Sequence, residues 1–82
     1  MEHAREEALN QLADLLTEIR KFENLREKKR GVFYRKSQAF LHFHEDKTGL
    51  FADLRIGSDW ERHPVNIPAE QQLFLDKIIA VF

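Results

Sequence analysis

Apolar residues recur at spacings of three and four through the first third of the chain, which contains no glycine or proline before residue 31. This spacing places them along one side of an α-helix. Gly31 is typical of the position just after a helix. The pattern predicts one long amphipathic helix over residues 1–30, with an apolar side made of Ala8, Leu9, Leu12, Leu15, Leu16, Ile19, Phe22 and Leu25.

The period of the pattern then changes to two. Three runs rich in aromatic and branched residues follow one another, separated by short turn signals. Such runs are typical of antiparallel strands, so we expect a three-stranded β-meander over residues 32–57. A tight turn at Lys36-Ser37 would set Tyr34 opposite Ala39 and Val32 opposite Leu41.

The register of the next hairpin follows from keeping apolar residues on one face of the sheet. We expect a turn between Asp46 and Gly49, with either Phe43 or Glu45 opposite Leu50. The predicted core face then carries Val32, Tyr34, Ala39, Leu41, Phe43, Leu50, Ala52, Leu54 and Ile56. The predicted interaction face carries Phe33, Arg35, Phe40, His42, His44, Phe51, Asp53 and Arg55.

The last part of the chain predicts a loop and then a second helix. Residues 58–67 contain a proline and form a loop or a short edge segment, because prolines confine strands to sheet edges. Pro68 suits the first turn of a helix over residues 68–82. We therefore expect a single α+β domain over residues 1–82: a long N-terminal helix, a three-stranded antiparallel meander (four-stranded if the edge segment pairs) and a C-terminal helix, in the order α-β-β-β-(β)-α.

Composition narrows the class of protein. The 82 residues are 43% hydrophobic and 33% charged, which is ordinary for a folded globular chain. The absence of cysteine excludes a disulfide scaffold and thiolate chemistry. No apolar run is long enough for a membrane span, and no signal peptide is recognisable. We expect a cytoplasmic protein with no membrane partner.

A second copy of the chain is the partner that the element lengths favour. A helix of roughly 27 residues is about 40 Å long, whereas a seven-residue strand spans about 23 Å. So small a sheet cannot cover the whole apolar side of that helix. The last helix also has an apolar surface that is wider than one side. We expect a homodimer, since two-fold dimers are the commonest soluble oligomers.

Histidines 42 and 44 alternate along a strand, so their imidazoles project from one face. This geometry suits a metal ion if further ligands are nearby. Asp53, Glu45 or His63 could complete such a site, but a half-exposed face packed against a neighbour explains the same pattern. The weak metal candidates are therefore His42, His44, His63 and Asp53.

Charge suggests an alternative partner. The net charge is −1, but residues 20–36 contain eight lysines and arginines against two glutamates. Arginines and phenylalanines on an open sheet face can also stack nucleobases. The candidate nucleic-acid contacts are Arg26, Lys28, Lys29, Arg30, Arg35 and Lys36.

Catalytic chemistry has little support in the sequence. The candidates for acid–base work are His42, His44, Glu45, Asp46, Asp53 and Asp59, but there is no nucleophile motif and no glycine-rich phosphate loop. We expect no enzyme activity and no cofactor. The leading hypothesis is a protein-interaction or dimerisation module; a nucleic-acid-associated module and a metal or small-ligand binder are the alternatives.

Overall fold

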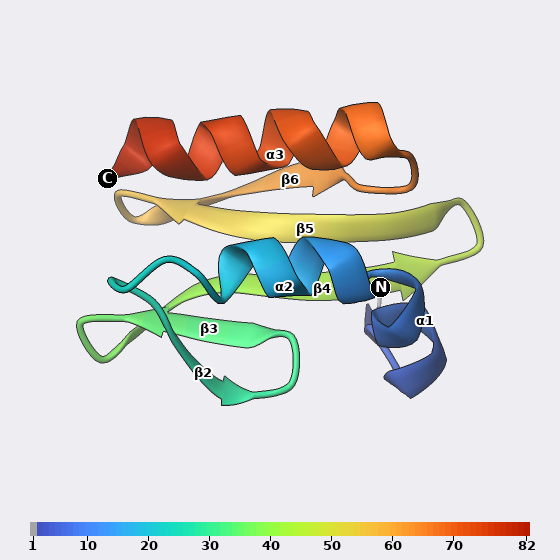
Figure 1. Cartoon of the computed structure of the whole chain (residues 1–82), viewed down its shortest axis with the longest axis horizontal. Coiled ribbons are helices and arrows are strands. Elements are labelled where there is room, and N and C mark those ends of the chain that lie inside the picture. The colour runs from blue at the N-terminus through green and yellow to red at the C-terminus, as the bar shows by residue number, and fades with distance from the viewer. Residues whose placement is uncertain (1) are drawn as a thin grey trace.

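The computed structural model describes the backbone of residues 2–82 and the side chains of residues 4–82. Helices lie near both ends of this region, and every strand except the short β1 lies between them in the chain (Figure 1). The helices are α1 (Glu6–Gln11), α2 (Ala13–Ile19) and α3 (Pro68–Val81). The strands are β1 (Glu2–His3), β2 (Arg26–Lys29), β3 (Val32–Arg35), β4 (Gln38–Asp46), β5 (Gly49–Ile56) and β6 (Asp59–Pro64).

The strands form one antiparallel sheet in the order β2-β3-β4-β5-β6, to which the two-residue β1 adds by pairing with β4. The α+β class and the antiparallel meander are thus confirmed. The edge segment expected after residue 57 forms a full strand, β6, which ends at Pro64. A proline is tolerated there because an edge strand needs hydrogen bonds on one side only.

The predicted long helix over residues 1–30 is wrong. Leu12, with φ −99° and ψ 13°, interrupts the helical path between α1 and α2. The second helix ends at Ile19, and residues 26–29 form β2 against β3. Met1, the first residue of the predicted helix, lies outside the described residues.

Contacts beyond the last turn of α2 explain why the helix stops. The Glu27 carboxylate accepts hydrogen bonds from Arg20 at 2.6 and 3.1 Å and from the backbone N–H of Gly31 at 2.9 Å. These bonds hold β2 beside the end of α2 as an extended strand. Phe22 and Leu25 still pack against the core, but from the turn that joins the two elements. The three- and four-residue spacing of these apolar side chains therefore reflects their burial, although the backbone that carries them is not helical.

The short helices also change the reasoning about a homodimer. α1 has six residues and α2 has seven, so neither overhangs the sheet as a helix over 1–30 would. Helix length therefore no longer favours a second copy. The homodimer remains a prediction, and it must rest on other surfaces.

The register of the central hairpin is as expected. Glu45 lies opposite Leu50, and Asp46 lies opposite Gly49 across the tight turn. Asp46 Oδ1 accepts hydrogen bonds from the backbone N–H and the hydroxyl of Thr48, which fixes that turn. In the preceding hairpin, Tyr34 pairs with its predicted partner on β4.

A β-bulge then reverses the faces of β3. Tyr34 pairs with Ala39 but Phe33 pairs with Leu41, which leaves Phe40 as an extra residue on β4. In a bulge two residues of one strand oppose one of the other, and the alternation of faces shifts by one. Val32 consequently pairs with a histidine, His42, and not with Leu41.

The bulge corrects several predicted positions. Phe33 and Phe40, predicted on the interaction face, are buried in the core. Arg35 lies over the rings of Phe40 and Phe82, at 5.7 and 5.1 Å from the ring centroids, and not on the interaction face. The residues predicted to be in the core that are only half-buried on β3 and β4 are Val32, Tyr34 and Ala39.

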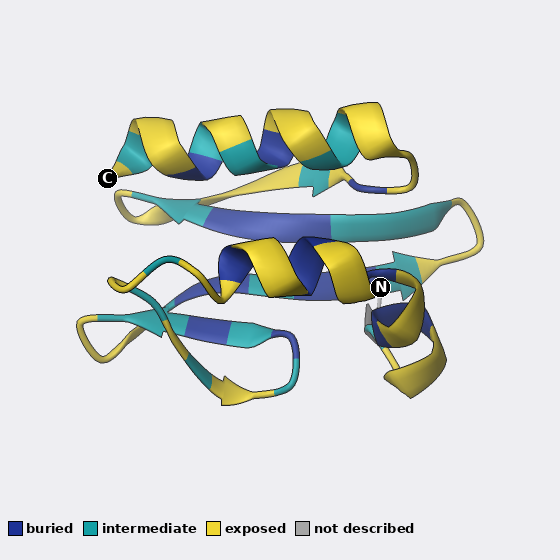
Figure 2. Cartoon of the chain, in the orientation of Figure 1, coloured by how far each residue is buried: buried dark blue, intermediate teal, exposed yellow. Residues whose placement is uncertain are grey.

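Helices α2 and α3 lie over one face of the sheet, here called the helix face (Figure 1). Dark blue buried positions gather along the middle of β5 and on the inward side of the helices (Figure 2). The opposite, outer face carries His42, His44, Phe51, Asp53, Arg55, Trp60 and Arg62, which are paired with one another across β4, β5 and β6.

The last helix begins where Pro68 follows Val65, Asn66 and Ile67. The Glu70 carboxylate accepts hydrogen bonds from the backbone N–H groups of Asn66 and Ile67, at 2.8 and 3.3 Å, and so caps the helix start. Among the described residues, no helix is long and apolar enough to cross a membrane.

Candidate functional sites

A cluster of two histidines and an aspartate lies on the outer face. The alternation of β4 presents His42 and His44 on the same side, and the β4–β5 register places Asp53 directly opposite His42. His44 Nε2 is 3.0 Å from Asp53 Oδ2, and one ligand atom from each of the three residues lies within 4.8 Å of the others. The structure thus brings together three of the four weak metal candidates. We call this set the His–Asp cluster.

The fourth candidate, His63, lies elsewhere. It pairs with Ala52 in the sheet and its ring is 5.5 Å from that of Phe74, so it belongs to the helix face. Its Nε2 lies 2.8 Å from a carboxylate oxygen of Glu61. His63 is therefore a histidine on the same sheet that takes no part in the cluster.

Arg62 completes the surroundings of Asp53. Its Nε donates to Oδ1 at 2.7 Å, and its Nη2 donates to Oδ2 at 2.8 Å. Asp53 is 5% exposed and His44 is 9% exposed, although both are polar. Burial acts to raise the pKa of Asp53, but the hydrogen bonds and charge of Arg62, helped by the two histidines, outweigh it and hold that pKa below its ordinary value.

Aromatic contacts hold His42 in place. Its ring centroid lies 4.7 Å from that of His44 and 4.5 Å from that of Trp60. The Arg55 guanidinium lies over the Trp60 ring, 4.5 Å from its centroid. The Nε of Arg55 donates a hydrogen bond to the backbone oxygen of Ala39 at 2.6 Å. The cluster is therefore a packed site and not a set of loose surface side chains.

Sequence reasoning missed Trp60 and Arg62 as members of this site. Both come from β6, which was expected only as a loop or edge segment. The available signal was the alternation of Trp60 and Arg62 directly before Pro64. Only the β5–β6 register shows that they face Arg55 and Asp53.

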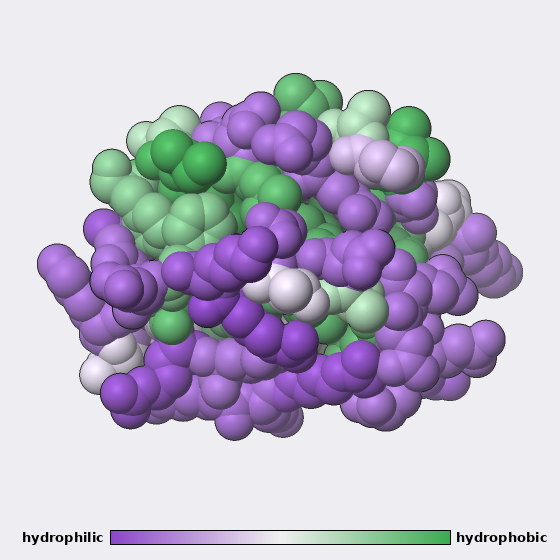
Figure 3. Space-filling view, viewed as in Figure 1, coloured by the Kyte–Doolittle hydropathy of each residue, from purple (hydrophilic) through white to green (hydrophobic). Residues whose placement is uncertain are grey.

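A second candidate surface is apolar and lies at the C-terminal end of α3. The Phe82 ring contacts that of Phe22 at 5.4 Å and stacks on that of Phe40 at 5.8 Å. Ile79, one turn earlier, is 58% exposed, and Phe82 is 39% exposed. In Figure 3, green hydrophobic atoms gather over this end of α3. We call Phe22, Ile79 and Phe82 the aromatic patch.

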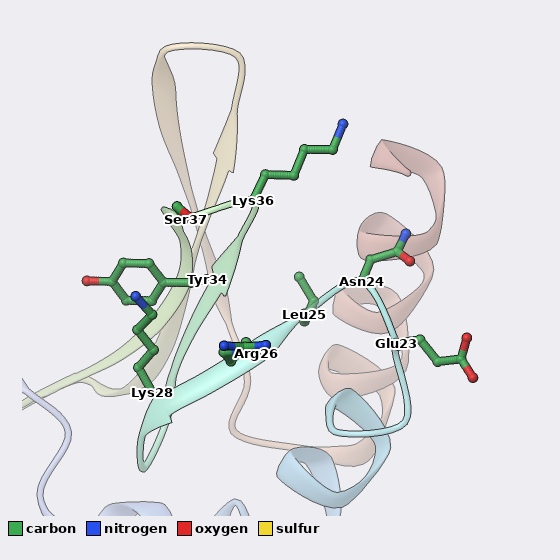
Figure 4. Close-up of a pocket in the computed structure, with 8 residues that line it drawn as sticks. All are labelled: Glu23, Asn24, Leu25, Arg26, Lys28, Tyr34, Lys36 and Ser37. Carbon is green, nitrogen blue, oxygen red and sulfur yellow. The ribbon is translucent and has the colours of Figure 1, made fainter.

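Only three of the six candidate nucleic-acid contacts line a common hollow. Arg30 is held by Glu6 and Asn10, at 2.6 and 2.8 Å. A hollow of about 340 Å³ is lined by Arg26, Lys28 and Lys36 together with Glu23, Asn24, Leu25, Tyr34 and Ser37. In Figure 4 the Lys28 amino group lies against the Tyr34 ring, whereas the Lys36 side chain extends away from it. These cations do not converge on a common ligand position.

The acid–base candidates near the cluster have structural partners. Glu45 accepts from the backbone N–H of Arg5 at 3.3 Å, and Asp46 fixes its turn through Thr48. Asp59 lies at the β5–β6 turn, where its backbone pairs with that of Ile56, away from the cluster. None of these three carboxylates belongs to the His–Asp cluster.

No protein-family model, curated protein or solved structure matches the chain significantly.

Proposed function

We propose that this protein is a non-catalytic association module that binds a second copy of itself through the aromatic patch. The observation that carries this proposal is the exposure of Ile79 and Phe82 beside Phe22, at a place where an isolated small domain would be expected to carry polar residues. Exposed apolar patches of this kind commonly mark contact sites for another protein.

The composition of the patch is that of an interface centre. Aromatic residues and arginine are enriched in protein–protein interfaces and among the residues that contribute most to binding. Phe22 and Phe82 supply the aromatic rings, and the Arg35 guanidinium lies over the Phe82 ring at 5.1 Å. Because Phe82 also stacks on the buried Phe40, the patch is anchored in the core.

The character of α3 supports the same proposal. Phe74 and Ile78 are buried in the core, while Leu73 and Ile79 are exposed. A helix that covers one side of a domain usually carries polar residues on its outward side, and a helix that is apolar on both sides is usually buried. Burial of the outward side of α3 against another chain would satisfy that expectation.

A second copy fits the charges around the patch. Arg35 lies at its rim, and Glu23 directly follows Phe22 in the chain. In a two-fold interface the same surface is used twice, so each residue type must meet its complement on the partner. The exposed Glu23 is the acidic residue that we expect to face Arg35 of the other copy, while the apolar residues meet one another.

Sedimentation velocity on the full chain over a concentration series tests this proposal. We expect a monomer–dimer equilibrium, with Ile79→Gln weakening the dimer by at least about tenfold. Ile67→Gln is the matched control, since Ile67 is 53% exposed but lies at the other end of α3. A wild-type chain that stays monomeric, or an equal effect of the two substitutions, would contradict the proposal.

Nucleic-acid binding and a cytoplasmic location remain predictions from the sequence. Burial of Phe33 and Phe40 removes two of the three phenylalanines expected to stack on bases. A titration with single-stranded RNA at two salt concentrations tests whether the basic side chains bind nucleic acid, because phosphate contacts weaken steeply with salt.

A further inference from the structure

The geometry points to a binding site for one divalent transition-metal ion of the zinc class at the His–Asp cluster, with His42, His44 and Asp53 as its ligands. This inference is independent of the proposed self-association. The cluster lies on the outer face, whereas the aromatic patch lies on the helix side of the sheet at the end of α3. Either can fail without the other.

The spacing of the ligand atoms suits a small ion. Zinc is held tetrahedrally at about 2.0–2.1 Å from nitrogen and oxygen ligands, which places neighbouring ligand atoms roughly 3.3 Å apart. His44 Nε2 and Asp53 Oδ2 are 3.0 Å apart, and all three ligand atoms lie within 4.8 Å of one another. The ligand atoms are thus up to about 1.5 Å further apart than in a formed tetrahedral site, and we expect the half-buried His42 ring to shift toward the ion on uptake.

The sheet fixes the ligands before any ion arrives. Two imidazoles come from alternate positions of one strand, and the carboxylate comes from the paired position on the next. Arg62 orients the carboxylate from the third strand through its Nε–Oδ1 hydrogen bond of 2.7 Å. Such outer hydrogen bonds to a ligand are typical of metal sites, because they hold the ligand in the binding geometry.

Arg62 also explains how the cluster is stabilised without an ion. Its Nη2 donates to Oδ2, the same oxygen that faces His44. On metal uptake we expect this second hydrogen bond to be given up while the bond to Oδ1 remains. Since Arg62 is exposed, its guanidinium has room to move in this way.

The donor set defines the class of ion. Imidazole nitrogens suit zinc, cobalt, nickel and copper, whereas magnesium and calcium prefer shells made of oxygen. Three protein ligands leave a fourth position of a tetrahedral ion for a water molecule or another small ligand. We therefore expect zinc and cobalt to bind and magnesium not to bind.

The test uses the full chain without an affinity tag, titrated with zinc chloride. Calorimetry should show one ion bound per chain, and the imidazole NMR signals of His42 and His44 should shift or broaden together. The signals of His63 provide an internal control, because that ring lies on the helix face beside Glu61. This titration needs no variant, so it does not depend on whether a substituted chain folds.

Variants identify the ligands. His42→Gln replaces a half-buried ligand and should lower the zinc affinity by at least about tenfold, while His63→Gln should leave it unchanged. Magnesium chloride at the same concentrations should leave the histidine signals in place. The proposal is overturned if zinc does not bind at one equivalent, if His63 responds with His42 and His44, or if His63→Gln weakens binding as much as His42→Gln does.

Discussion

Arg62 donates a hydrogen bond to each carboxylate oxygen of Asp53 across the β5–β6 strand pair, at 2.7 and 2.8 Å. This fork places an exposed guanidinium over one of the most deeply buried charged groups of the described chain. Two parallel hydrogen bonds of this kind are stronger and more directional than a single ion pair. The contact therefore links the edge strand β6 to the centre of the outer face.

Replacement of Arg62 by methionine should destabilise the fold by about 2 kcal/mol, because the buried Asp53 carboxylate loses its principal donors. Methionine keeps much of the apolar stem, so the loss reports the guanidinium. Chemical denaturation measures it. Lys21→Gln, which breaks an exposed pair with Glu18, is the control and should cost no more than about 0.5 kcal/mol. Equal costs would show that the Asp53 contact is merely a surface ion pair.

Phe33→Ala should cost about 3–5 kcal/mol, the usual range for a buried phenylalanine. Val32→Ala, its neighbour on the outer face, should cost far less because Val32 is only half-buried. Urea unfolding of the two variants compares them directly. The opposite ranking would mean that β3 pairs without the bulge and that Val32 faces the core.

Gly49→Ala should destabilise by about 2 kcal/mol, since it combines a positive φ with a steric clash. Gly49 has φ +136°, and an added Cβ would collide with Asn66 Oδ1, which accepts the N–H of Leu50 at 2.7 Å. Gly57 has φ +64° and nothing within 4 Å of such a Cβ. Gly57→Ala should therefore cost only about 1 kcal/mol, and thermal unfolding that ranks the pair the other way would refute this reading.

The Arg20–Glu27 contact should make stability fall at acid pH. The hydrogen bond from Arg20 is the largest of the effects that lower the pKa of Glu27 in the folded chain. A carboxyl whose pKa is lowered on folding contributes its full stability above its ordinary pKa of about 4.3, and it loses that contribution as pH falls through the folded pKa.

Glu27→Gln isolates that contribution. Near neutral pH the variant should be less stable than the wild type, and the difference should shrink as pH falls below about 4, where Glu27 becomes protonated. Urea midpoints at several pH values measure this. A difference that stays constant down to pH of about 2 would mean that Glu27 does not contribute through its charge.

The sequence pattern predicted the register of the central β4–β5 hairpin correctly, because the tight turn between Asp46 and Gly49 fixes it. His42, His44 and Asp53 share a face in the sequence pattern and in the structure. The bulge at Phe40 could not be derived in this way, because a strict period of two assigns Phe40 and Leu41 to opposite faces. Two adjacent large apolar residues within an alternating strand are the signal that would have suggested it.

The prediction of one long helix over residues 1–30 was wrong for a different reason. Phe22 and Leu25 continue the apolar spacing of α2, but they are buried from a turn. Pairing of β2 with β3 and the Glu27 contacts with Arg20 and Gly31 outweigh helix propensity here. The apolar spacing of residues 20–30 alone does not distinguish a helix from a turn whose apolar side chains are buried.

Intermolecular NOEs test the central claim, self-association through the aromatic patch, most directly. A mixture of isotopically labelled and unlabelled chains would show only contacts between copies. We expect such contacts from the Ile79 methyl groups and from the Phe22 and Phe82 rings to the same residues of the partner. Absence of any intermolecular contact at concentrations well above the measured Kd, or contacts confined to Trp60 and its neighbours on the outer face, would contradict the claim.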